Sequence, residues 1–556
     1  MALNPATTAK NLLATPGLTA GRFVAWTFGL LLLAPVVFTL LALVTSQGGE
    51  SWSHVREYTL GPAVRSSLIL VIFTGLFSTL FGLPAAWCVT HYNFPGRKLL
   101  SVLLVLPLAI PPYIAAYVTT EAREAAIPLL ISIREDHGVD AYLRAEVFHR
   151  YAWLVIMMAS VLFPYIFLSC RAVFASQARH LAEAGRLLGA SPWRTFRTIH
   201  LPLIRPALIA GLFLVSMEVL SDYGAAKHLG MPTLTVTIFR TWFGLDELET
   251  ARYLSSWVLA AIFLVLLLER WQRGRARFAA RRNPLPRTSL KVRGTVLAWL
   301  VCGLPVALGL LFPIFTLLDW HFTSTQTIPF AELLPSLRQT LLIGLLVTAA
   351  CLLLALLVLA TARFAKSKQD RFLTTTLFTA GYASPSTIMA VGVLGLAALA
   401  REAFPAQSWL GPLLLSGSLL WLAFALTARY LTVAGQVLSA GFAAIPPSYD
   451  HAARTLGRKL ANIFRTIHLP LLRAPLLGAA VLVFVDVTKE LPLTLLLRPF
   501  DFETLGTTAY SSVNQGRILE CAAPSLLLIA LSCTGLLLVE LTGWTRNHSS
   551  KNKRTD

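Results

Sequence analysis

The sequence predicts an all-α membrane protein with about twelve transmembrane helices, arranged as two parallel repeats of six. Of the 556 residues, 56% are hydrophobic and 13% are charged, whereas a soluble domain carries about a quarter charged residues. Apolar runs long enough to span a bilayer recur along the whole chain. The octapeptide FRTIHLPL occurs twice, at 196–203 and at 464–471. Together these observations indicate a duplicated bundle of membrane helices.

The apolar runs predict the individual spans. In chain order they lie at about 22–45, 64–90, 98–120, 152–174, 205–222, 253–270, 294–319, 337–362, 373–398, 408–430, 474–490 and 523–544. An arginine-rich linker, RWQRGRARFAARRNPLPRTSLKVRG, separates two sets of spans. An even number of spans in each set gives both the same orientation, which makes a parallel repeat. We therefore expect an N-terminal tail (1–21), a first transmembrane domain (22–270), a basic linker (271–293), a second transmembrane domain (294–544) and a basic C-terminal tail (545–556).

The net charge of +20 does not indicate a nucleic-acid partner, because the charge is unevenly distributed. With the N-terminus placed inside, most lysines and arginines fall in inside segments, and this bias sets the orientation of a membrane protein. We therefore expect both termini in the cytoplasm. Membrane lipid is a partner, since anionic headgroups attract the basic segments. The six cysteines show no spacing typical of a metal cluster or a disulfide framework.

Each copy of the octapeptide belongs to a longer polar repeat between two spans. The copies read HLAEAGRLLGASPWRTFRTIHLPLIRPAL (180–208) and SYDHAARTLGRKLANIFRTIHLPLLRAPL (448–476). A glycine is placed to end a first short helix, and in the first copy Ser191-Pro192 is a typical start for a second one. The repeat predicts a helix–turn–helix elbow on the cytoplasmic face. A basic helix resting on lipid would not require two copies at matching positions, so we interpret the elbows as docking sites for a two-fold partner.

The elbows resemble the EAA motif of ABC-importer permeases. The matching residues are Glu183, Ala184, Gly185, Gly189, Ile199 and Pro202 in the first copy, and His451, Ala452, Ala453, Gly457, Ile467 and Pro470 in the second. His451 departs from the motif, because the family often has glutamate there. In that family the elbow is the coupling helix that sits in a cleft of each ATPase subunit. The resemblance implies a fused type I permease in a bacterial inner membrane, with two copies of an ABC ATPase subunit as partners.

The chain has no GxxxxGK[ST] phosphate-binding loop. We therefore expect a transport subunit without enzymatic activity or a cofactor of its own, and we expect separate partner subunits to use the ATP.

Superposing the two octapeptides aligns GLFLVSMEVLSDYG (211–224) with AAVLVFVDVTKELP (479–492). Each segment carries two carboxylates spaced i, i+4, which places them on one helix face. Ionisable groups inside a span are costly and are candidates for a function. Alternatively, they lie beyond the helix ends in water, or pair with Lys489 and Arg240. Proline-interrupted spans at matching positions are a second indication of a pathway. The predicted path residues are Glu218, Asp222, Asp486, Lys489, Glu490, Pro112, Tyr113 and Pro385.

Three segments resemble ferric-iron permeases: LPLAIPPYIAAYV (106–118), SDYGAAKHLGMPTLTVTIFRTWFG (221–244) and VDVTKELPLTLLLRPFDFETLGTTAY (485–510). This resemblance implies import of Fe(III) delivered by a periplasmic binding protein. Carboxylate oxygens suit a hard cation, so the four aligned carboxylates are candidates for a transient metal contact but not for a permanent metal site. Thiamine, polyamine and phosphonate permeases share the architecture and stay open as alternatives. An ion-coupled secondary transporter is the alternative from another class, in which the carboxylates would bind protons or sodium.

Overall fold

The computed structural model describes residues 16–176, 191–273, 287–324, 328–365, 378, 381, 384–404 and 419–552. The first half contains α2 (Pro16–Thr45), α3 (Trp52–His54), η1 (Val55–Thr59), α4 (Leu60–His91), β1 (Tyr92–Asn93), α5 (Arg97–Leu103), η2 (Leu106–Ala109), α6 (Pro112–Tyr117), α7 (Thr120–Glu124), α8 (Ile127–His137), α9 (Val139–Ser176), α11 (Pro192–Thr195), η3 (Phe196–His200), α12 (Leu201–Ser221), α13 (Gly224–His228), α14 (Leu234–Leu245) and α15 (Leu248–Arg273). Here η denotes a 3₁₀- or π-helix.

Among the described residues, the second half begins with a short strand. It contains β2 (Thr288–Ser289), α16 (Val292–Val306), η4 (Ala307–Leu311), α17 (Phe312–Thr323), α18 (Phe330–Ala365), α20 (Ser386–Ala403), α22 (Leu419–Ala443), α23 (Pro447–Thr455), α24 (Leu460–Ile463), η5 (Phe464–His468), α25 (Leu469–Leu471), α26 (Arg473–Thr488), α27 (Pro492–Leu497), α28 (Leu505–Asn514), η6 (Ile518–Cys521) and α29 (Ala522–Asn552). The pair β1–β2 is parallel, and it is the whole of the sheet in the described part of the chain.

The all-α membrane class is confirmed. Ten helices among the described residues are long and apolar enough to cross a membrane, and two sharply bent helix pairs could raise this number to twelve. One pair, Arg97–Ala109 with Pro112–Glu124, bends by 90°. The predicted third span is therefore broken, at two prolines that interrupt the backbone hydrogen bonds of a helix. The other pair, Leu460–Leu471 with Arg473–Thr488, bends by 71°. The predicted end of the tenth span at 430 is wrong, since α22 continues to Ala443.

Small residues allow the membrane helices to pack closely. On α4, the face toward α9 carries Ser78 and Gly82, and a Cβ at Gly82 would lie only 2.8 Å from the carbonyl oxygen of Phe163. Such contacts between small residues are typical of helix packing inside membranes. The opposite face of α4 is an apolar stripe at helical spacing, suited to lipid tails. It consists of Leu68, Ile72, Leu76 and Leu80, which are 50–61% exposed.

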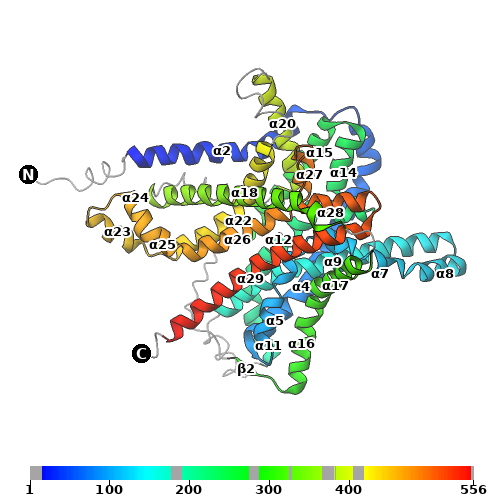
Figure 1. Ribbon diagram of the computed structural model, residues 1–556, viewed down its shortest axis with the longest axis horizontal. Helices are drawn as coiled ribbons and strands as arrows, with labels where there is room; N and C mark the ends of the chain where they lie inside the picture. Colours follow the sequence, from blue (N-terminus) through cyan, green and yellow to red (C-terminus); the bar gives the residue numbers. More distant parts are fainter. Residues whose placement is uncertain are drawn as a thin grey trace, which may run out of the picture.

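The two halves exchange their first spans. Helix α2 packs against α18 and α20 of the second half, while α16 and η4 pack against α4 and α9 of the first (Figure 1). Glycines bring these helices together: a Cβ at Gly392 would lie 2.5 Å from the oxygen of Pro35, and a Cβ at Gly309 would lie 1.9 Å from the oxygen of Ser160. The halves are therefore interlocked rather than merely adjacent.

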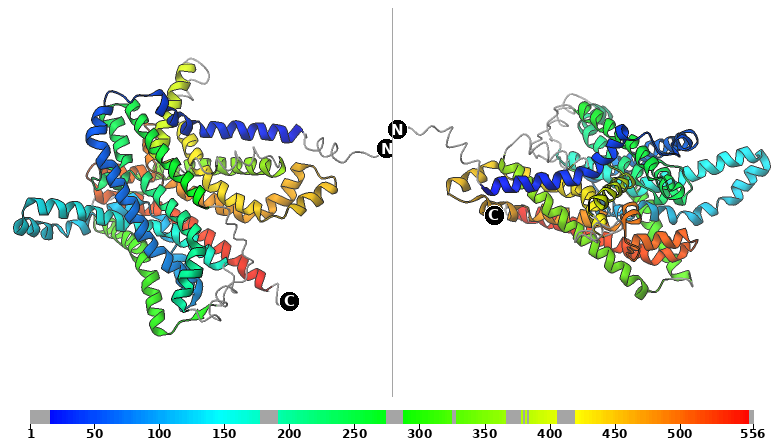
Figure 2. Two further views of the ribbon diagram at one scale, coloured as in Figure 1. Left: turned by 180° about the vertical axis from the view of Figure 1, so that it is seen from behind. Right: turned by 90° about the horizontal axis from the view of Figure 1, so that it is seen from above.

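Both copies of FRTIH form the same π-helical turn, η3 and η5, and in both the histidine is buried (His200 and His468). The elbow elements α11 and α23 lie apart, at the ends of different helix bundles (Figures 1 and 2). The hairpin formed by α8 and the start of α9 projects from another side of the molecule (Figure 1).

Candidate functional site

A small cavity of about 40 Å³ lies between the two halves. It has room for only a few water-sized groups. The predicted path residues that line it are Pro112, Tyr113, Glu218, Asp222, Lys489 and Glu490. The two other predicted residues lie beside it: Asp486 forms an ion pair with Lys489, at 2.8 Å between Oδ1 and Nζ, and Pro385 precedes the lining residue Ser386.

The expectation that each carboxylate pair shares one helix face is wrong. Helix α12 ends at Ser221 and α26 ends at Thr488, so Asp222 and Glu490 lie beyond their helices. In the first half, the Asp222 carboxylate offers backbone N–H groups an alternative to the helical hydrogen bonds, as aspartates do at helix ends. In the second half, Pro492 lacks the N–H that would continue the helix.

Asp222 and Glu490 each cap the next short helix. A carboxylate oxygen of Asp222 accepts a hydrogen bond from the backbone N–H of Ala226 (3.0 Å), and Glu490 accepts one from the N–H of Leu493 (3.3 Å). They are only 8% and 7% exposed. The alternative of carboxylates beyond the helix ends is thus confirmed for these two, but they are buried in protein rather than exposed to water.

The sequence reasoning missed a buried cation, Arg429, and its neighbour Tyr430, both of which line the cavity. Arg429 is 1% exposed, and Tyr430 donates a hydrogen bond to Glu490. The signal was available, because an arginine within an apolar run is a candidate for a function. It was overlooked because the predicted span ended at 430, which put Arg429 at a helix end instead of within α22.

Tyr113 covers the cavity, and two glycines make room for its ring. A Cβ at Gly224 would lie 2.7 Å from Tyr113 Cβ, and a Cβ at Gly506 would lie 2.7 Å from its hydroxyl oxygen. Nearby, Lys227 of α13 donates a hydrogen bond to the hydroxyl of Tyr510 on α28 (2.7 Å), which joins the two halves. These contacts join the two halves on the side of α13 and α28.

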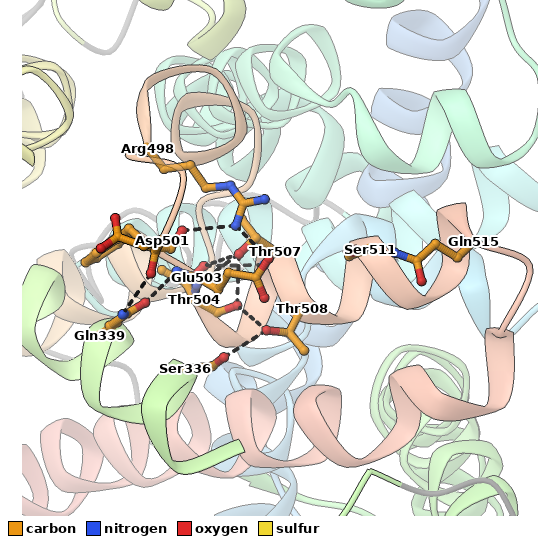
Figure 3. Close-up of polar contacts among 11 residues, drawn as sticks. Ser336, Gln339, Arg498, Asp501, Glu503, Thr504, Thr507, Thr508, Ser511 and Gln515 are labelled. Atoms are coloured by element: carbon orange, nitrogen blue, oxygen red, sulfur yellow. Dashed lines mark hydrogen bonds and ion pairs between the residues drawn. The ribbon is translucent and has the colours of Figure 1, made fainter. Parts of the chain in front are cut away.

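A polar network fixes α28, and thereby Gly506, against α18 (Figure 3). Thr504 and Thr507 form a capping box at the start of the helix, which satisfies backbone donors at its N-terminus. The hydroxyls of Ser336 and Thr508 are hydrogen-bonded at 3.0 Å, and Arg498 forms an ion pair with Glu503 at 3.0 Å. The position of Gly506 is therefore set by the scaffold of the second half.

The carboxylates do not form a metal site in this conformation. Among the described residues, no group of three or more His, Cys, Asp or Glu side chains is placed to hold a metal ion. Three carboxylates and two cations line the cavity, so the lining combines opposite charges and holds one more carboxylate than it has cations.

The second elbow is anchored by a buried carboxylate, Asp450. Its two oxygens bind Arg363 Nε (2.8 Å) and His468 Nε2 (2.6 Å), and Arg363 also donates to the carbonyls of Phe442 and Ile445. Burial would raise the pKa of Asp450, but the hydrogen bonds from Arg363 and His468 outweigh it and lower the pKa below its ordinary value. The acidic residue of this elbow thus faces its own transmembrane domain.

The helix ends predicted for the elbows are present where the residues are described. Gly457 has φ +72° and ends α23 with the two hydrogen bonds of a Schellman motif, and Ser191 caps the helix that begins at Pro192. His451 and Ala452 are exposed, and Ala453 is buried. Ile199 and Ile467 are half-buried, and Pro202 and Pro470 follow in the next elements, α12 and α25. The remaining predicted residues, Glu183, Ala184, Gly185 and Gly189, lie outside the described residues.

Comparison with known proteins places this architecture in a family. Residues 78–273 match the family described as binding-protein-dependent transport system inner membrane component. The chain is 23% identical over 526 residues to the Fe(3+)-transport system permease protein FbpB 2 of Haemophilus influenzae, covering 92% of this chain and 96% of that protein. It is 28% identical over 245 residues to the sulfate transport system permease protein CysT of Escherichia coli, and 24% identical over 248 residues to CysW of the same organism. Each match covers 43% of this chain, and 85% and 83% of those proteins, respectively.

FbpB 2 aligns with nearly the whole chain, and therefore with both sets of spans. Permeases of this family work with ATPase and binding-protein partners. The chain is therefore a multi-pass inner-membrane protein, the fused two-domain permease subunit of an ABC importer.

Proposed function

We propose that this permease imports Fe(III), delivered by a periplasmic binding protein, through a path that passes the cavity between its halves. One observation carries the proposal: carboxylates outnumber cations in the cavity lining. Glu218, Asp222 and Glu490 face Arg429 and Lys489. Hard cations prefer oxygen ligands of this kind, and a lining with excess negative charge repels an anion.

The lengths of the alignments with relatives favour a metal cargo over sulfate. FbpB 2, whose name specifies Fe(3+) transport, aligns with both halves of the chain. The sulfate permeases CysT and CysW each align with less than half of it. Sulfate is nevertheless the cargo that these relatives raise as the second candidate. Permeases for thiamine, polyamines and phosphonate share the architecture, and these cargoes rank behind sulfate as candidates.

The proposed mechanism is alternating access driven from the elbows. Two copies of an ABC ATPase bind the elbows on the cytoplasmic face, where both termini also lie. ATP binding draws the two elbows together and opens the path on the side of Tyr113, and hydrolysis resets it. The closed contacts of Tyr113 and Lys227, together with the separate positions of α11 and α23, correspond to the state before ATP binds. The chain itself forms and breaks no covalent bond and needs no cofactor.

Uptake of labelled Fe(III) tests the proposal. Iron-starved cells that carry the neighbouring subunits should lose uptake when this gene is deleted and regain it with the wild type. The double variant Glu218→Gln/Asp486→Asn should restore at most about a tenth of it, since losing a hydrogen bond to a charged group costs about 1.5–3 kcal/mol and about 1.4 kcal/mol is tenfold in rate.

The control is labelled sulfate in the same cells. Sulfate uptake that depends on this gene, with unchanged Fe(III) uptake, would refute the iron assignment. Co-purification of an ATPase separates an ABC importer from an ion-coupled secondary transporter, which should not retain one. Arg517→Gln, which breaks an arginine–glutamate pair outside the cavity, should leave uptake near wild type.

A further inference from the structure

Arg429 connects the places where three membrane segments are interrupted. From the middle of α22, its Nη2 donates to the hydroxyl of Ser221 at the end of α12 (3.1 Å). Its Nη1 donates to the carbonyl of Ser384, just before α20 (2.7 Å). Its Nε lies 3.8 Å from Glu490 Oε2, just beyond α26. Since Ser221 belongs to the first half and Arg429 to the second, the guanidinium also joins the halves.

Lys489 holds the neighbouring carboxylate in a similar way. It forms an ion pair with Asp486 and donates to the carbonyl of Leu108 in the first half (3.3 Å). Leu108 lies in η2, immediately before the 90° break of the third span. Both cations of the second half thus bind one of its carboxylates and one acceptor across the interface. Buried carboxylates need such compensation, because an unpaired charge in this environment is strongly unfavourable.

The cavity also presents an oxygen that the protein leaves unused. The hydroxyl of Ser386 lines the cavity, is buried, and has no hydrogen-bond partner among the described residues. With Glu490 and Glu218 it provides oxygen atoms around a small space beside the guanidinium. Arginine stays protonated under all physiological conditions, so its charge leaves the site only if the side chain moves.

We propose that Arg429 is a tethered counterion, which occupies the place of a cation at Glu490 while the path is empty and must be displaced by the cargo. When the halves separate, the bond to Ser221 breaks and the guanidinium withdraws, so that Glu490 and Ser386 become available to the cargo cation. A cargo of higher charge competes better with a single guanidinium, which makes Arg429 a specificity-determining residue. This inference rests on the proposed function in taking the cargo to be a cation.

Terbium(III) binding tests the inference without iron. Tb(III) is a hard trivalent ion, and its emission is sensitised by nearby tyrosines such as Tyr113 and Tyr430. The importer, purified with its own ATPase in lipid nanodiscs, is titrated with Tb(III). Arg429→Gln should bind Tb(III) at least about tenfold more tightly than the wild type, because a repelling charge within a few ångströms has been removed. Arg429→Lys, which keeps the charge, should bind as weakly as the wild type.

Two further variants fix the interpretation. Adding Glu490→Gln to Arg429→Gln should return the affinity to the wild-type level, since the exposed carboxylate is removed; the amide that replaces it keeps an oxygen that can accept the Leu493 N–H. The matched control Arg517→Gln breaks an arginine–glutamate pair within one half and should leave Tb(III) affinity unchanged. If Arg429→Gln does not assemble, Ser221→Ala serves instead, because it removes the hydroxyl that holds Arg429 across the interface without leaving a buried carboxylate uncompensated, and it should also tighten Tb(III) binding.

The outcomes separate this inference from the proposed cargo. Equal Tb(III) affinity in wild type and Arg429→Gln overturns the counterion, even if the wild type imports Fe(III). Tighter binding by Arg429→Gln that Glu490→Gln reverses supports the counterion, even if uptake shows that the physiological cation is not iron. Tighter binding that persists without Glu490 places the ion elsewhere and also overturns the inference.

Discussion

At the scale of single residues, two glycines from different halves receive the ring of Tyr113. The two are not equivalent. A methyl group at Gly224 would meet Cβ of Tyr113 at 2.7 Å and Leu491 Cδ2 at 2.9 Å, whereas one at Gly506 would meet the hydroxyl end of Tyr113. Because Cβ moves only with its backbone, the first contact cannot be relieved by rotating the side chain.

Gly224→Ala should therefore impair both stability and uptake, with a loss of about 1–3 kcal/mol typical of overpacking. Thermal unfolding in nanodiscs and labelled uptake measure it. Gly506→Ala should have a smaller effect, and Tyr113→Phe should reverse it, because the hydroxyl that the methyl meets is then absent. Gly478→Ala is the control, with nothing within 4 Å of the added group. Equal effects of all three alanines would contradict the role of Tyr113.

At the scale of elements, hydrophobicity and cap residues predicted which helices exist but not how they end inside the membrane. The caps at Ser191 and Gly457 depend on local geometry, so the sequence sufficed for them. Asp222 lies beyond α12 because capping α13 competes with continuing the helix. The apolar periodicity of the sequence does not show which of the two prevails. Arg429 could be recognised as lying within a span only from the true length of α22. The carboxylates were thus predictable as a cluster, but their counterion Arg429 was not.

The second elbow depends on Asp450, which ties α23 to α18 through Arg363. Asp450→Asn removes the charge of that pair and should destabilise the elbow by about 1.5–3 kcal/mol near neutral pH. The lowered pKa of Asp450 means that the pair contributes fully above the ordinary carboxyl pKa, and that the contribution is lost as pH falls through the lowered value. Thermal unfolding curves of variant and wild type should therefore converge in acid.

The exposed neighbour His451 provides the comparison for this element. His451→Ala should leave thermal stability unchanged, because the side chain lies outside the network. A midpoint for Asp450→Asn that stays below the wild type by the same amount at every pH would show that the ionised carboxylate is not what anchors the elbow.

At the scale of the whole molecule, the exchange of the first spans makes each half incomplete alone. Helix α2 covers the second half, and α16 with η4 covers the first. The parallel repeat thus behaves as an interlocked dimer within one chain. Its tightest crossing is Gly309 against Ser160, where even a methyl group would collide with backbone.

A chain cut within 274–286 should therefore still assemble. When the two pieces are produced together, a tag on one should recover the other from the membrane. Gly309→Ala should abolish this recovery, since an added Cβ would lie 1.9 Å from the Ser160 oxygen and neither backbone can yield without separating the helices. Gly303→Ala on the same span has nothing within 4 Å and should leave recovery intact. If Gly309→Ala pieces assemble as well as the wild type, the central cavity and not the exchanged spans holds the halves together, and the Arg429→Gln variant should then be the one that separates them.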